Sequence, residues 1–365
     1  MEIAIKDLGE IITGNTPSKK EESFWDSDDI CFVKPDGISD DGITLIRDSN
    51  EYLSENARKK ARVVSKDAVF VTCIGSIGKI GIASEGDYAF NQQINVVVSN
   101  EKVLPRYLAY NLLFSKPRLE AIANAPVVPI INKTQFGEFV ISIEESIDKQ
   151  EQIVSTLDKL SGIICRRKAE LEELDNLIKA RFVELFGDPR INPLGYDTKE
   201  LGKTCTVITG NTPSRKVPEY YGDYMEWIKT DNIASGVLNP TEAAECLSES
   251  GVNEGRCVDK NAILMACIAG SIASIGRVCV TDRRVAFNQQ INAIVPGEYN
   301  TLFLYILLQI SKDYLVEDIN MALKGILSKS RLEEKVFIVP PMELQNQFAD
   351  FVKQVDKSKV AVQKS

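Results

Sequence analysis

The 365-residue chain is longer than one hydrophobic core usually fills, so it predicts at least two globular units. Its 44% hydrophobic and 26% charged residues are ordinary for a folded protein and exclude a wholly disordered or collagen-like chain. The formal net charge is −9, and the excess of acidic residues is spread along the chain instead of lying in an acidic tail attached to a basic domain. This balance argues against tight, independent nucleic-acid binding, because neutralisation of phosphates supplies most non-specific affinity.

The chain contains no histidine, which excludes a histidine-based acid, base or catalytic triad and leaves cysteine and carboxylate as ligands for any metal. The eight cysteines are scattered without a Cys-x-x-Cys pair, and we expect them to be reduced and mostly buried. The longest apolar run, residues 302–308, is far shorter than the roughly 20 residues that span a bilayer, and the N-terminus lacks a signal-peptide pattern. These features favour a cytoplasmic protein with no membrane partner.

Two sequence blocks occur twice, in the same order. Gly14-Asn15-Thr16-Pro17-Ser18 returns as Gly210-Asn211-Thr212-Pro213-Ser214, and Phe90-Asn91-Gln92-Gln93-Ile94-Asn95 returns as Phe287-Asn288-Gln289-Gln290-Ile291-Asn292. Between them, Phe32-Val33-Lys34-Pro35-Asp36-Gly37-Ile38 matches Trp227-Ile228-Lys229-Thr230-Asp231-Asn232-Ile233, and residues 73–79 match residues 267–277 with a small insertion. The chain is therefore predicted to be two copies of one unit.

Each copy begins with short β-branched runs separated by turn residues, which predict strands, for example at residues 68–72 and 94–98. A proline-started apolar segment at 105–114 predicts a buried helix. The last strand is expected at 139–143 in the first copy and 336–339 in the second. Each copy should thus form an α/β-mixed, mainly antiparallel domain.

Residues 146–186 contain no proline and one glycine, and they predict a long helix of about 60 Å. One heptad position is apolar throughout, at Leu157, Ile164, Leu171, Ile178 and Leu185. The second copy ends in a shorter helical pattern with Leu344, Phe348, Phe351 and Val355. We expect these apolar residues to pack the two helices antiparallel. One stretch of the longer helix then remains for a partner subunit or for self-association with a second copy.

The predicted fold class is α+β, with two duplicated globular domains separated by two long helices that form an antiparallel coiled coil. The expected bounds are 1–143 for the first domain, 144–188 for the first helical spacer, 189–339 for the second domain and 340–365 for the second helix.

The order and duplication of these motifs closely resemble the specificity subunit of type I restriction-modification enzymes, over the full chain. Phe186-Gly187-Asp188-Pro189 after the first helix belongs to the same pattern. The resemblance implies that each domain is a target recognition domain for one half of a bipartite double-stranded DNA sequence, and that the helices are a spacer and docking surface. It also implies two methyltransferase subunits, which bind S-adenosylmethionine, and restriction subunits, which use ATP and Mg, with no cofactor in this chain.

The residues themselves agree with a non-catalytic role. The Asn/Asp-Pro-Pro-Tyr/Phe loop of an adenine-N6 methylase is missing, because the Pro340-Pro341 pair lies between Val339 and Met342. Gly75-Ser76-Ile77-Gly78-Lys79 has the wrong spacing for a phosphate-binding loop of a motor ATPase.

Base reading is expected where the copies differ, at residues 39–62 and 115–134 against 234–256 and 311–330, because shared residues cannot make two domains read different half-sites. The shared Asn-Gln-Gln-Ile-Asn block is therefore predicted to be structural. Shared basic residues are candidates for phosphate contacts, because such contacts position a protein on DNA without specifying its sequence and can recur in both domains. For each of these residues, ordinary exposure to solvent is the alternative explanation. The candidate DNA-binding residues are Lys19, Lys20, Lys34, Arg58, Lys59, Lys60, Arg62, Lys79, Arg215, Lys216, Lys229, Arg256, Arg277 and Lys324.

Two other functions compete with DNA recognition. A duplicated enzyme with an active site between its halves is favoured only by the repeated Asp36 and Asp231. A coiled-coil scaffold is the second alternative.

Overall fold

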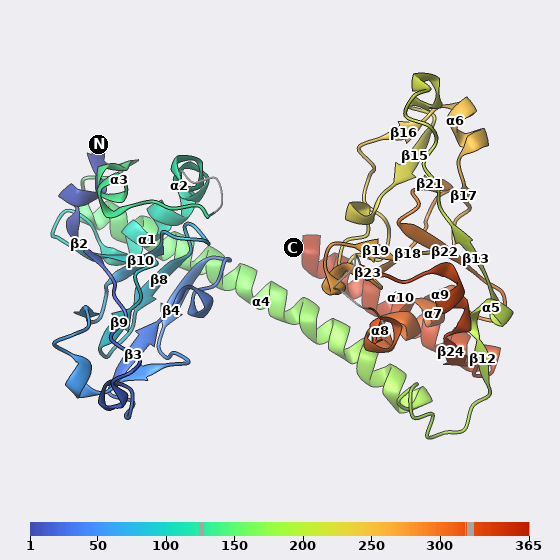
Figure 1. Cartoon of the computed structure of the whole chain (residues 1–365), viewed down its shortest axis with the longest axis horizontal. Helices are drawn as coiled ribbons and strands as arrows, with labels where there is room; N and C mark the ends of the chain where they lie inside the picture. Colours follow the sequence, from blue (N-terminus) through green and yellow to red (C-terminus); the bar gives the residue numbers. More distant parts are fainter. Residues whose placement is uncertain (124–127, 318, 320–324, 365) are drawn as a thin grey trace. The chain divides into compact units, whose positions relative to one another are not determined.

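The computed structural model describes residues 1–123, 128–317, 319 and 325–364, and the chain divides into two compact units, Met1–Arg166 and Arg167–Ser365 (Figure 1). The division falls within α4 (Ile147–Phe186), so each unit contains one globular domain and part of this helix. The sequence places the helix in a spacer of its own at 144–188, whereas in the structure its two halves belong to different units.

Unit 1 contains a main sheet of five strands in the order β2-β10-β7-β8-β4. These strands are β2 (Gly9–Thr13), β10 (Ile94–Ser99), β7 (Val69–Thr72), β8 (Ile80–Ala83) and β4 (Ile43–Ile46). Side chains alternate across a strand, so Val69 and Val71 enter one hydrophobic core and Phe70 enters another. The main sheet is therefore buried on both faces.

Helices cover one face of this sheet, and a second sheet covers the other. The helices are α1 (Pro105–Phe114), α2 (Lys116–Ile122) and α3 (Lys133–Glu138), which bury Leu108, Leu119 and Phe136. The second sheet has the order β5-β3-β9-β6, with β5 (Tyr52–Leu53), β3 (Ile30–Val33), β9 (Tyr88–Phe90) and β6 (Val63–Val64). The N-terminal β1 (Glu2–Ala4) pairs with β11 (Val140–Ser142) and closes the domain.

Unit 2 repeats this plan, which confirms the duplicated fold predicted from the motifs. Its main sheet has the order β13-β22-β18-β20, with β13 (Cys205–Thr209), β22 (Ile291–Pro296), β18 (Ile263–Ala266) and β20 (Val278–Val280). Its second sheet has the order β14-β16-β15-β21-β17, with β14 (Tyr221–Gly222), β16 (Cys246–Leu247), β15 (Met225–Ile228), β21 (Val285–Phe287) and β17 (Cys257–Val258). Helices α7 (Thr301–Ile310), α8 (Lys312–Val316) and α9 (Lys329–Glu334) correspond to α1, α2 and α3, and β12 (Thr198–Glu200) pairs with β24 (Val336–Ile338).

The two domains differ at the edge of the main sheet. In unit 1, β4 adds a parallel strand beside β8. In unit 2, the backbone N–H of Val280 donates instead to Leu238 O at 2.7 Å, and Asn239 Nδ2 donates to Val280 O at 2.8 Å. Most strand pairs are antiparallel, as expected, but β3–β9 and β15–β21 are also parallel, because the chain crosses between the two sheets instead of turning back in a hairpin.

Matching glutamines hold both long helices to their domains. Gln150 in α4 is fully buried, and its Oε1 accepts a hydrogen bond from Leu104 N at 2.9 Å. Gln345 in α10 (Met342–Lys364) makes the same contact with Asn300 N, also at 2.9 Å. None of the described helices combines the length and apolarity needed to cross a membrane.

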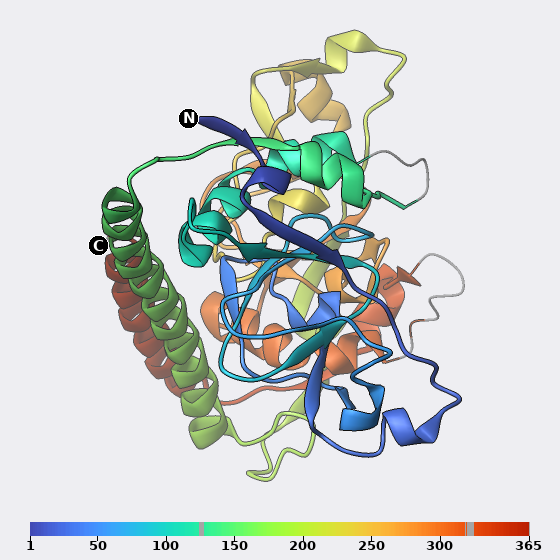
Figure 2. The same cartoon turned by 90° about the vertical axis from the view of Figure 1, so that its left-hand side faces the viewer.

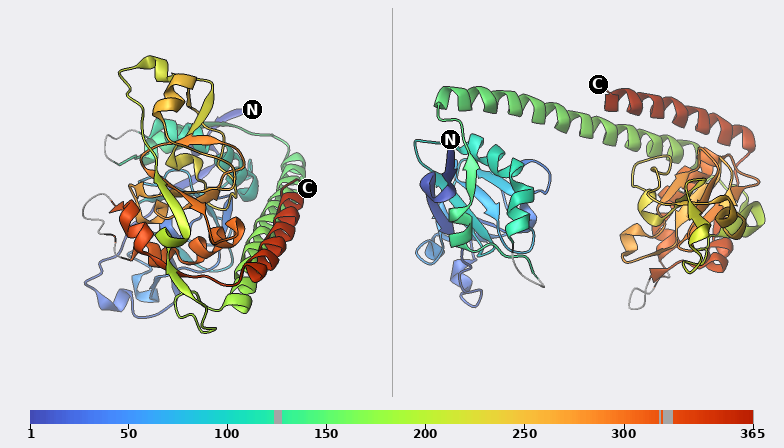
Figure 3. Two further views of the ribbon diagram at one scale, coloured as in Figure 1. Left: turned by 90° about the vertical axis from the view of Figure 1, so that its right-hand side faces the viewer. Right: turned by 90° about the horizontal axis from the view of Figure 1, so that it is seen from above.

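The second half of α4 lies beside α10 in unit 2, and the two helices run in opposite directions (Figures 2 and 3). Phe348 near the start of α10 contacts Phe182 near the end of α4, with ring centroids 5.5 Å apart. Lys359 near the end of α10 pairs with Asp175 of α4 at 2.5 Å. The antiparallel helix pair predicted from the sequence is thus present within this unit.

The predicted seam of this pair needs correction. Ile178, Phe348 and Val355 are buried in the core of unit 2, and Leu185, Leu344 and Phe351 pack against it. In contrast, Leu157 lies in unit 1 beside α1, Leu171 is half-buried, and Ile164 is 48% exposed. An α-helix drifts by about 20° per heptad from a strict seven-residue repeat, and α4 changes its packing partner along its length. One heptad line therefore cannot stay buried from end to end.

Two aromatic residues that the heptad pattern missed dominate the helix packing. Phe182 and Phe186 follow Ile178 at four-residue spacing, and both are fully buried. The ring of Phe182 stacks on Phe303 of α7 with centroids 5.6 Å apart, and Phe186 meets Phe348 at 5.6 Å. The four-residue spacing of these side chains is the sequence signal that could have identified them.

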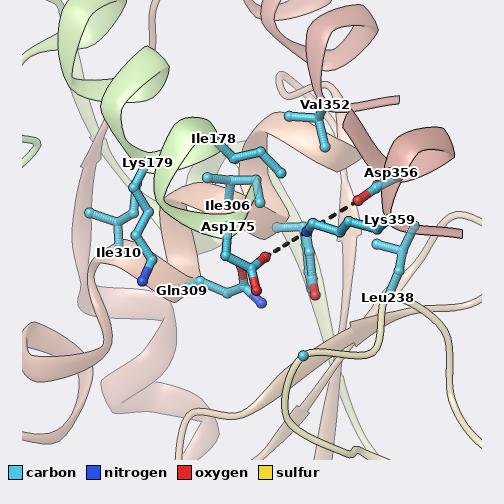
Figure 4. Close-up of a pocket in the computed structure, with 12 residues that line it drawn as sticks. Asp175, Ile178, Lys179, Leu238, Ile306, Gln309, Ile310, Val352, Asp356 and Lys359 are labelled. Atoms are coloured by element: carbon cyan, nitrogen blue, oxygen red, sulfur yellow. Dashed lines mark hydrogen bonds and ion pairs between the residues drawn. The ribbon is translucent and has the colours of Figure 1, made fainter. Parts of the chain in front are cut away.

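A lysine between two carboxylates joins the helices at the far end of the pair (Figure 4). The Lys359 side chain is 18% exposed, and its Nζ lies 2.5 Å from Asp175 Oδ1 and 3.4 Å from Asp356 Oδ1. Burial raises the pKa of Asp356 above its ordinary value, and the ammonium of Lys359 opposes that rise. Lys359 thus offsets the repulsion between the two neighbouring carboxylates.

We expect Lys359→Met to lower the free energy of unfolding by about 1 to 2 kcal/mol at about pH 7, because it leaves two carboxylates without their cation. Burial raises the pKa of Asp356 in the folded protein, so its ionised form destabilises the fold at pH values above its folded pKa. Protonation of Asp356 removes this cost, so the difference in unfolding free energy between the variant and the wild type should shrink as the pH falls to about 4.5. Denaturant unfolding at both pH values measures this. Lys353→Met removes an exposed ion pair from the same helix and serves as the control. A deficit no larger than that of the control would contradict the prediction.

Candidate nucleic-acid interface

The repeated Gly-Asn-Thr-Pro-Ser loop is closed against the repeated Asn-Gln-Gln block. Gly14 N donates to Ile94 O at 3.1 Å, and Thr16 Oγ1 donates to Gln92 Oε1 at 3.0 Å. A side chain at Gly14 would place its Cβ 2.2 Å from Asn91 O, so glycine is required there. Asn91 is 7% exposed. These contacts give the shared block the structural role that the sequence predicts.

Unit 2 contains the same closure. Gly210 N donates to Ile291 O at 3.0 Å, and Thr212 donates to Gln289. A Cβ at Gly210 would lie 2.2 Å from Asn288 O. The loop is therefore a common frame on which both domains build.

A glutamate holds two cations beside this loop in each unit; we call these residues the cation clusters. In unit 1, Glu51 pairs with Lys19 at 2.7 Å and with Lys34. In unit 2, Glu245 pairs with Arg215 at 2.6 Å and with Lys229 at 2.8 Å. Hydrogen bonds from the cations lower the pKa of both glutamates, so each carboxylate is firmly ionised.

Each cation cluster rests on a pair of aromatic rings. In unit 1, Trp25 and Phe32 meet edge to face at 5.2 Å, and Lys19 Nζ lies 4.6 Å from the centroid of Trp25. In unit 2, Tyr221 and Trp227 meet at 6.0 Å, and the guanidinium of Arg215 lies 4.3 Å from the centroid of Tyr221. Cation–π attraction thus holds Lys19 in unit 1 and both cations in unit 2, while Lys19 and Arg215 stay partly exposed.

The glutamates were missed because they lie inside segments that the sequence comparison assigned as divergent. Glu51-Tyr52-Leu53-Ser54-Glu55 and Glu245-Cys246-Leu247-Ser248-Glu249 share a Glu-x-Leu-Ser-Glu pattern. Its serines have the same role, since Ser54 N donates to Phe24 O at 2.9 Å and Ser248 N to Tyr220 O at 3.0 Å. The segments 39–62 and 234–256 are thus partly shared, and this short pattern is the signal that identifies their common part.

The shared loop also binds the end of the first divergent segment. Asn15 Nδ2 donates to Lys60 O at 2.7 Å, and its Oδ1 accepts from Arg62 N at 2.9 Å. Asn211 Nδ2 likewise donates to Glu254 O at 2.8 Å. In the described part of the chain, five exposed basic side chains around these contacts make no ion pair: Lys20, Lys59, Lys60, Arg62 and Lys216.

Arg58 differs from its neighbours in the basic run. Its guanidinium is half-buried and pairs with Glu55 and Asp87, each at 2.5 Å. The run follows a single 3-10 turn, Glu55–Ala57. Arg58 therefore anchors the segment to the second sheet.

Both divergent segments meet at the shared turn that contains Lys79. Lys79 Nζ lies 3.2 Å from Asp40 Oδ2, and Lys116 Nζ lies 3.5 Å from Asp40 Oδ1. Asp40 belongs to the first divergent segment and Lys116 to the second. Lys79 Nζ also donates to Pro35 O at 3.4 Å, which places the turn next to Lys34 of the cation cluster. In unit 1, the Lys79 turn therefore lies next to the cation cluster and to both divergent segments, and the shared loop adjoins the same region.

The corresponding turn of unit 2 also contacts the helix that follows α7, but its arginine bonds within the turn and not to the first divergent segment. Lys312 Nζ donates to Ala273 O at 2.6 Å, and Arg277 Nε donates to Ser274 O at 3.3 Å. The second divergent segment adds a strand here, since β23 (Gly325–Ile326) pairs with β19 (Ile268–Ala269). Arg256 caps the neighbouring strand by donating to Thr209 O at 3.0 Å. Lys324 lies outside the described residues.

Within each unit, the described surroundings of the aspartates and cysteines show no catalytic arrangement. Asp36 and Asp231 are exposed on the 3-10 turns Pro35–Gly37 and Thr230–Asn232. Cys73, Cys205, Cys267 and Cys279 are buried, and burial raises the pKa of the Cys73 and Cys267 thiols to about 12. Such thiols are poor nucleophiles.

A duplicated mixed domain with one shared basic frame and two variable segments defines a recognition protein. The family model described as the type I restriction modification DNA specificity domain matches residues 1–174 and 193–365. The chain therefore belongs to the family of type I restriction-modification specificity subunits, which are non-catalytic because the chemistry lies in partner subunits. This membership confirms the resemblance inferred from the repeated motifs.

Individual relatives agree with the family. The chain is 24% identical over 378 residues to the type I restriction enzyme MjaIX specificity subunit of Methanocaldococcus jannaschii, covering 95% of this chain and 84% of that protein. It is 33% identical over 192 residues to the HindI specificity subunit of Haemophilus influenzae, covering 50% of this chain and 41% of that protein. Its fold is similar to the S subunit of a type I restriction-modification system from M. genitalium, with a TM-score of 0.58 and 14% identity over 100% of this chain and 91% of that chain.

Proposed function

We propose that each domain reads one half of a bipartite double-stranded DNA target, with the two divergent segments contacting bases and the shared loop and turn contacting the backbone. The observation that carries this proposal is the junction at Asp40, where both divergent segments of unit 1 meet the basic turn of Lys79. Base contacts specify a sequence and phosphate contacts position the protein, so variable segments on a shared basic frame suit both tasks.

We further propose that two methyltransferase subunits, which bind S-adenosylmethionine, dock on the first half of α4 and on α1, and that restriction subunits using ATP and Mg join them in the cytoplasm. Exposed apolar side chains support this location: Phe114 is 88% exposed, Leu160 51% and Ile153 39%. Because the chain carries a net charge of −9, its partners complete the positive surface around the duplex.

The test is an exchange of segments in the complex with methyltransferase subunits. Replacement of residues 39–50 and 115–134 by those of a relative with another target should change one half of the methylated sequence and leave the other half intact. Sequencing of methylated genomic sites reads both halves at once. The matched control replaces residues 234–244 and 311–330, which should change the other half only. Alteration of both halves, or of neither, in an active complex would contradict the assignment.

A further inference from the structure

We infer that the cation clusters of Glu51 and Glu245 are a matched pair of docking sites for DNA backbone phosphates, one in each domain. This inference rests on the proposed function and adds the residues that hold the duplex without reading it. In each site the two cations bind the phosphate, and the glutamate pairs with both cations and offsets part of their charge.

The first support is that the same arrangement is built twice around a shared glutamate and lysine, with a different second cation and different rings. Lys19 corresponds to Arg215, and the order of ring types is reversed, with Trp25 and Phe32 in unit 1 against Tyr221 and Trp227 in unit 2. The second cation and the rings differ, but two cations, one carboxylate and two rings recur. A packing requirement would fix the shapes of the residues, whereas here the charges and their spacing are retained.

The second support is that the cations keep capacity for another anion. Lys19 is 58% exposed and Arg215 is 55% exposed at the side chain. A lysine ammonium has three N–H donors and a guanidinium has five, so the glutamate does not exhaust them. With two cations and one carboxylate, each cluster keeps one net positive charge in a chain whose total is −9.

The third support is energetic. Ion pairs at partly exposed positions contribute little to the stability of the fold, because water screens them. Stability therefore gives little reason to place a second cation on each glutamate. A phosphate gives such a reason, because two fixed cations can bind its oxygens together, and a site that recognises only phosphate serves both domains equally well.

The experiment uses the complete complex with its methyltransferase subunits and measures its affinity for target and non-target duplexes over a range of salt concentrations. We expect Lys19→Gln and Arg215→Gln each to weaken binding to both duplexes about tenfold. The slope of log affinity against log salt should become shallower by about 0.9, the value for one lost phosphate contact. The methylated sequence should stay the same.

The glutamates should respond in the opposite direction. Glu51→Gln and Glu245→Gln release the cations from their carboxylate, so we expect severalfold tighter binding to every duplex and a steeper salt slope. Lys199 and Glu298 form an exposed ion pair in unit 2 at 2.6 Å, so Lys199→Gln and Glu298→Gln reproduce the charge changes elsewhere on the chain. These controls should bind DNA like the wild type.

Two outcomes separate this inference from the proposed function. If the wild-type complex selects no bipartite target, the proposed function fails. If it selects its target but the cluster variants keep the salt slope of the Lys199 and Glu298 controls, this inference alone is overturned. Thermal unfolding of each variant is measured in parallel, and a change in stability without a change in salt slope would likewise overturn it in favour of a purely structural cluster.

Discussion

Insertion of seven residues after Ile164 in α4 is expected to lengthen the non-specific gap of the DNA target while leaving both half-site sequences unchanged. The insertion point is exposed, and it lies between Gln150, which anchors the helix to unit 1, and Ile178, which is buried in unit 2. Seven residues add two nearly complete turns and about 10 Å of helix. At about 3.4 Å of duplex per base pair, this corresponds to a gap longer by up to about three base pairs.

The matched control is a seven-residue insertion in the loop after α4, next to Ile191, which is 75% exposed. The second half of α4 packs directly on unit 2, so a longer loop should not change the gap. Sequencing of methylated sites measures gap and half-sites together. An active α4 insertion variant with an unchanged gap would show that this helix does not set the spacing.

Phe182→Ala is expected to lower the free energy of unfolding of unit 2 by about 3 to 5 kcal/mol, because it removes a fully buried ring and leaves a cavity between the helices. The ring is packed against Phe303 and Phe348, and the helix pair depends on it. Leu177→Ala, at a position 48% exposed on the same helix, should cost less than about 0.5 kcal/mol.

The two tryptophans allow unit 2 to be followed separately. Trp25 lies in unit 1 and Trp227 in unit 2, so in a Trp25→Phe background the fluorescence of Trp227 reports the unfolding of unit 2. Denaturant titration of Phe182→Ala in this background measures the loss. Equal midpoints for Phe182→Ala and Leu177→Ala would contradict the central role of the aromatic cluster.

The duplication made the fold predictable, because repeated motifs mark equivalent elements and alternating apolar runs mark buried strands. The pairing of those strands was less accessible. The parallel contact of β4 with β8 joins residues far apart in sequence, and nothing in Ile43–Ile46 indicates which strand it meets. The passage of the chain from one sheet to the other, which makes these strand pairs parallel, depends on long-range packing and leaves no local sequence pattern.

The basic residues of the candidate interface could be identified from the sequence, but the carboxylates that pair with them could not. Sequence comparison identified Lys19 and Lys34 because cations recur at their repeats, but the sign of a charge does not reveal whether a carboxylate lies beside it. Glu51 binds both lysines from a distant part of the chain. For the same reason Arg58 seemed exposed in the sequence, although Asp87 draws it toward the second sheet.

Asn15 and Asn211 hold the adjoining variable segments through main-chain atoms, at Lys60 O, Arg62 N and Glu254 O. Apart from the missing N–H of proline, main-chain groups are the same in every amino acid, so these attachments tolerate most residues whose backbone can follow the same path. Under the proposed function, side chains of these variable segments can then be replaced singly, or whole segments exchanged by recombination, without rebuilding the core. A new target specificity is therefore within reach of few genetic steps, while the surfaces that assemble the complex remain untouched.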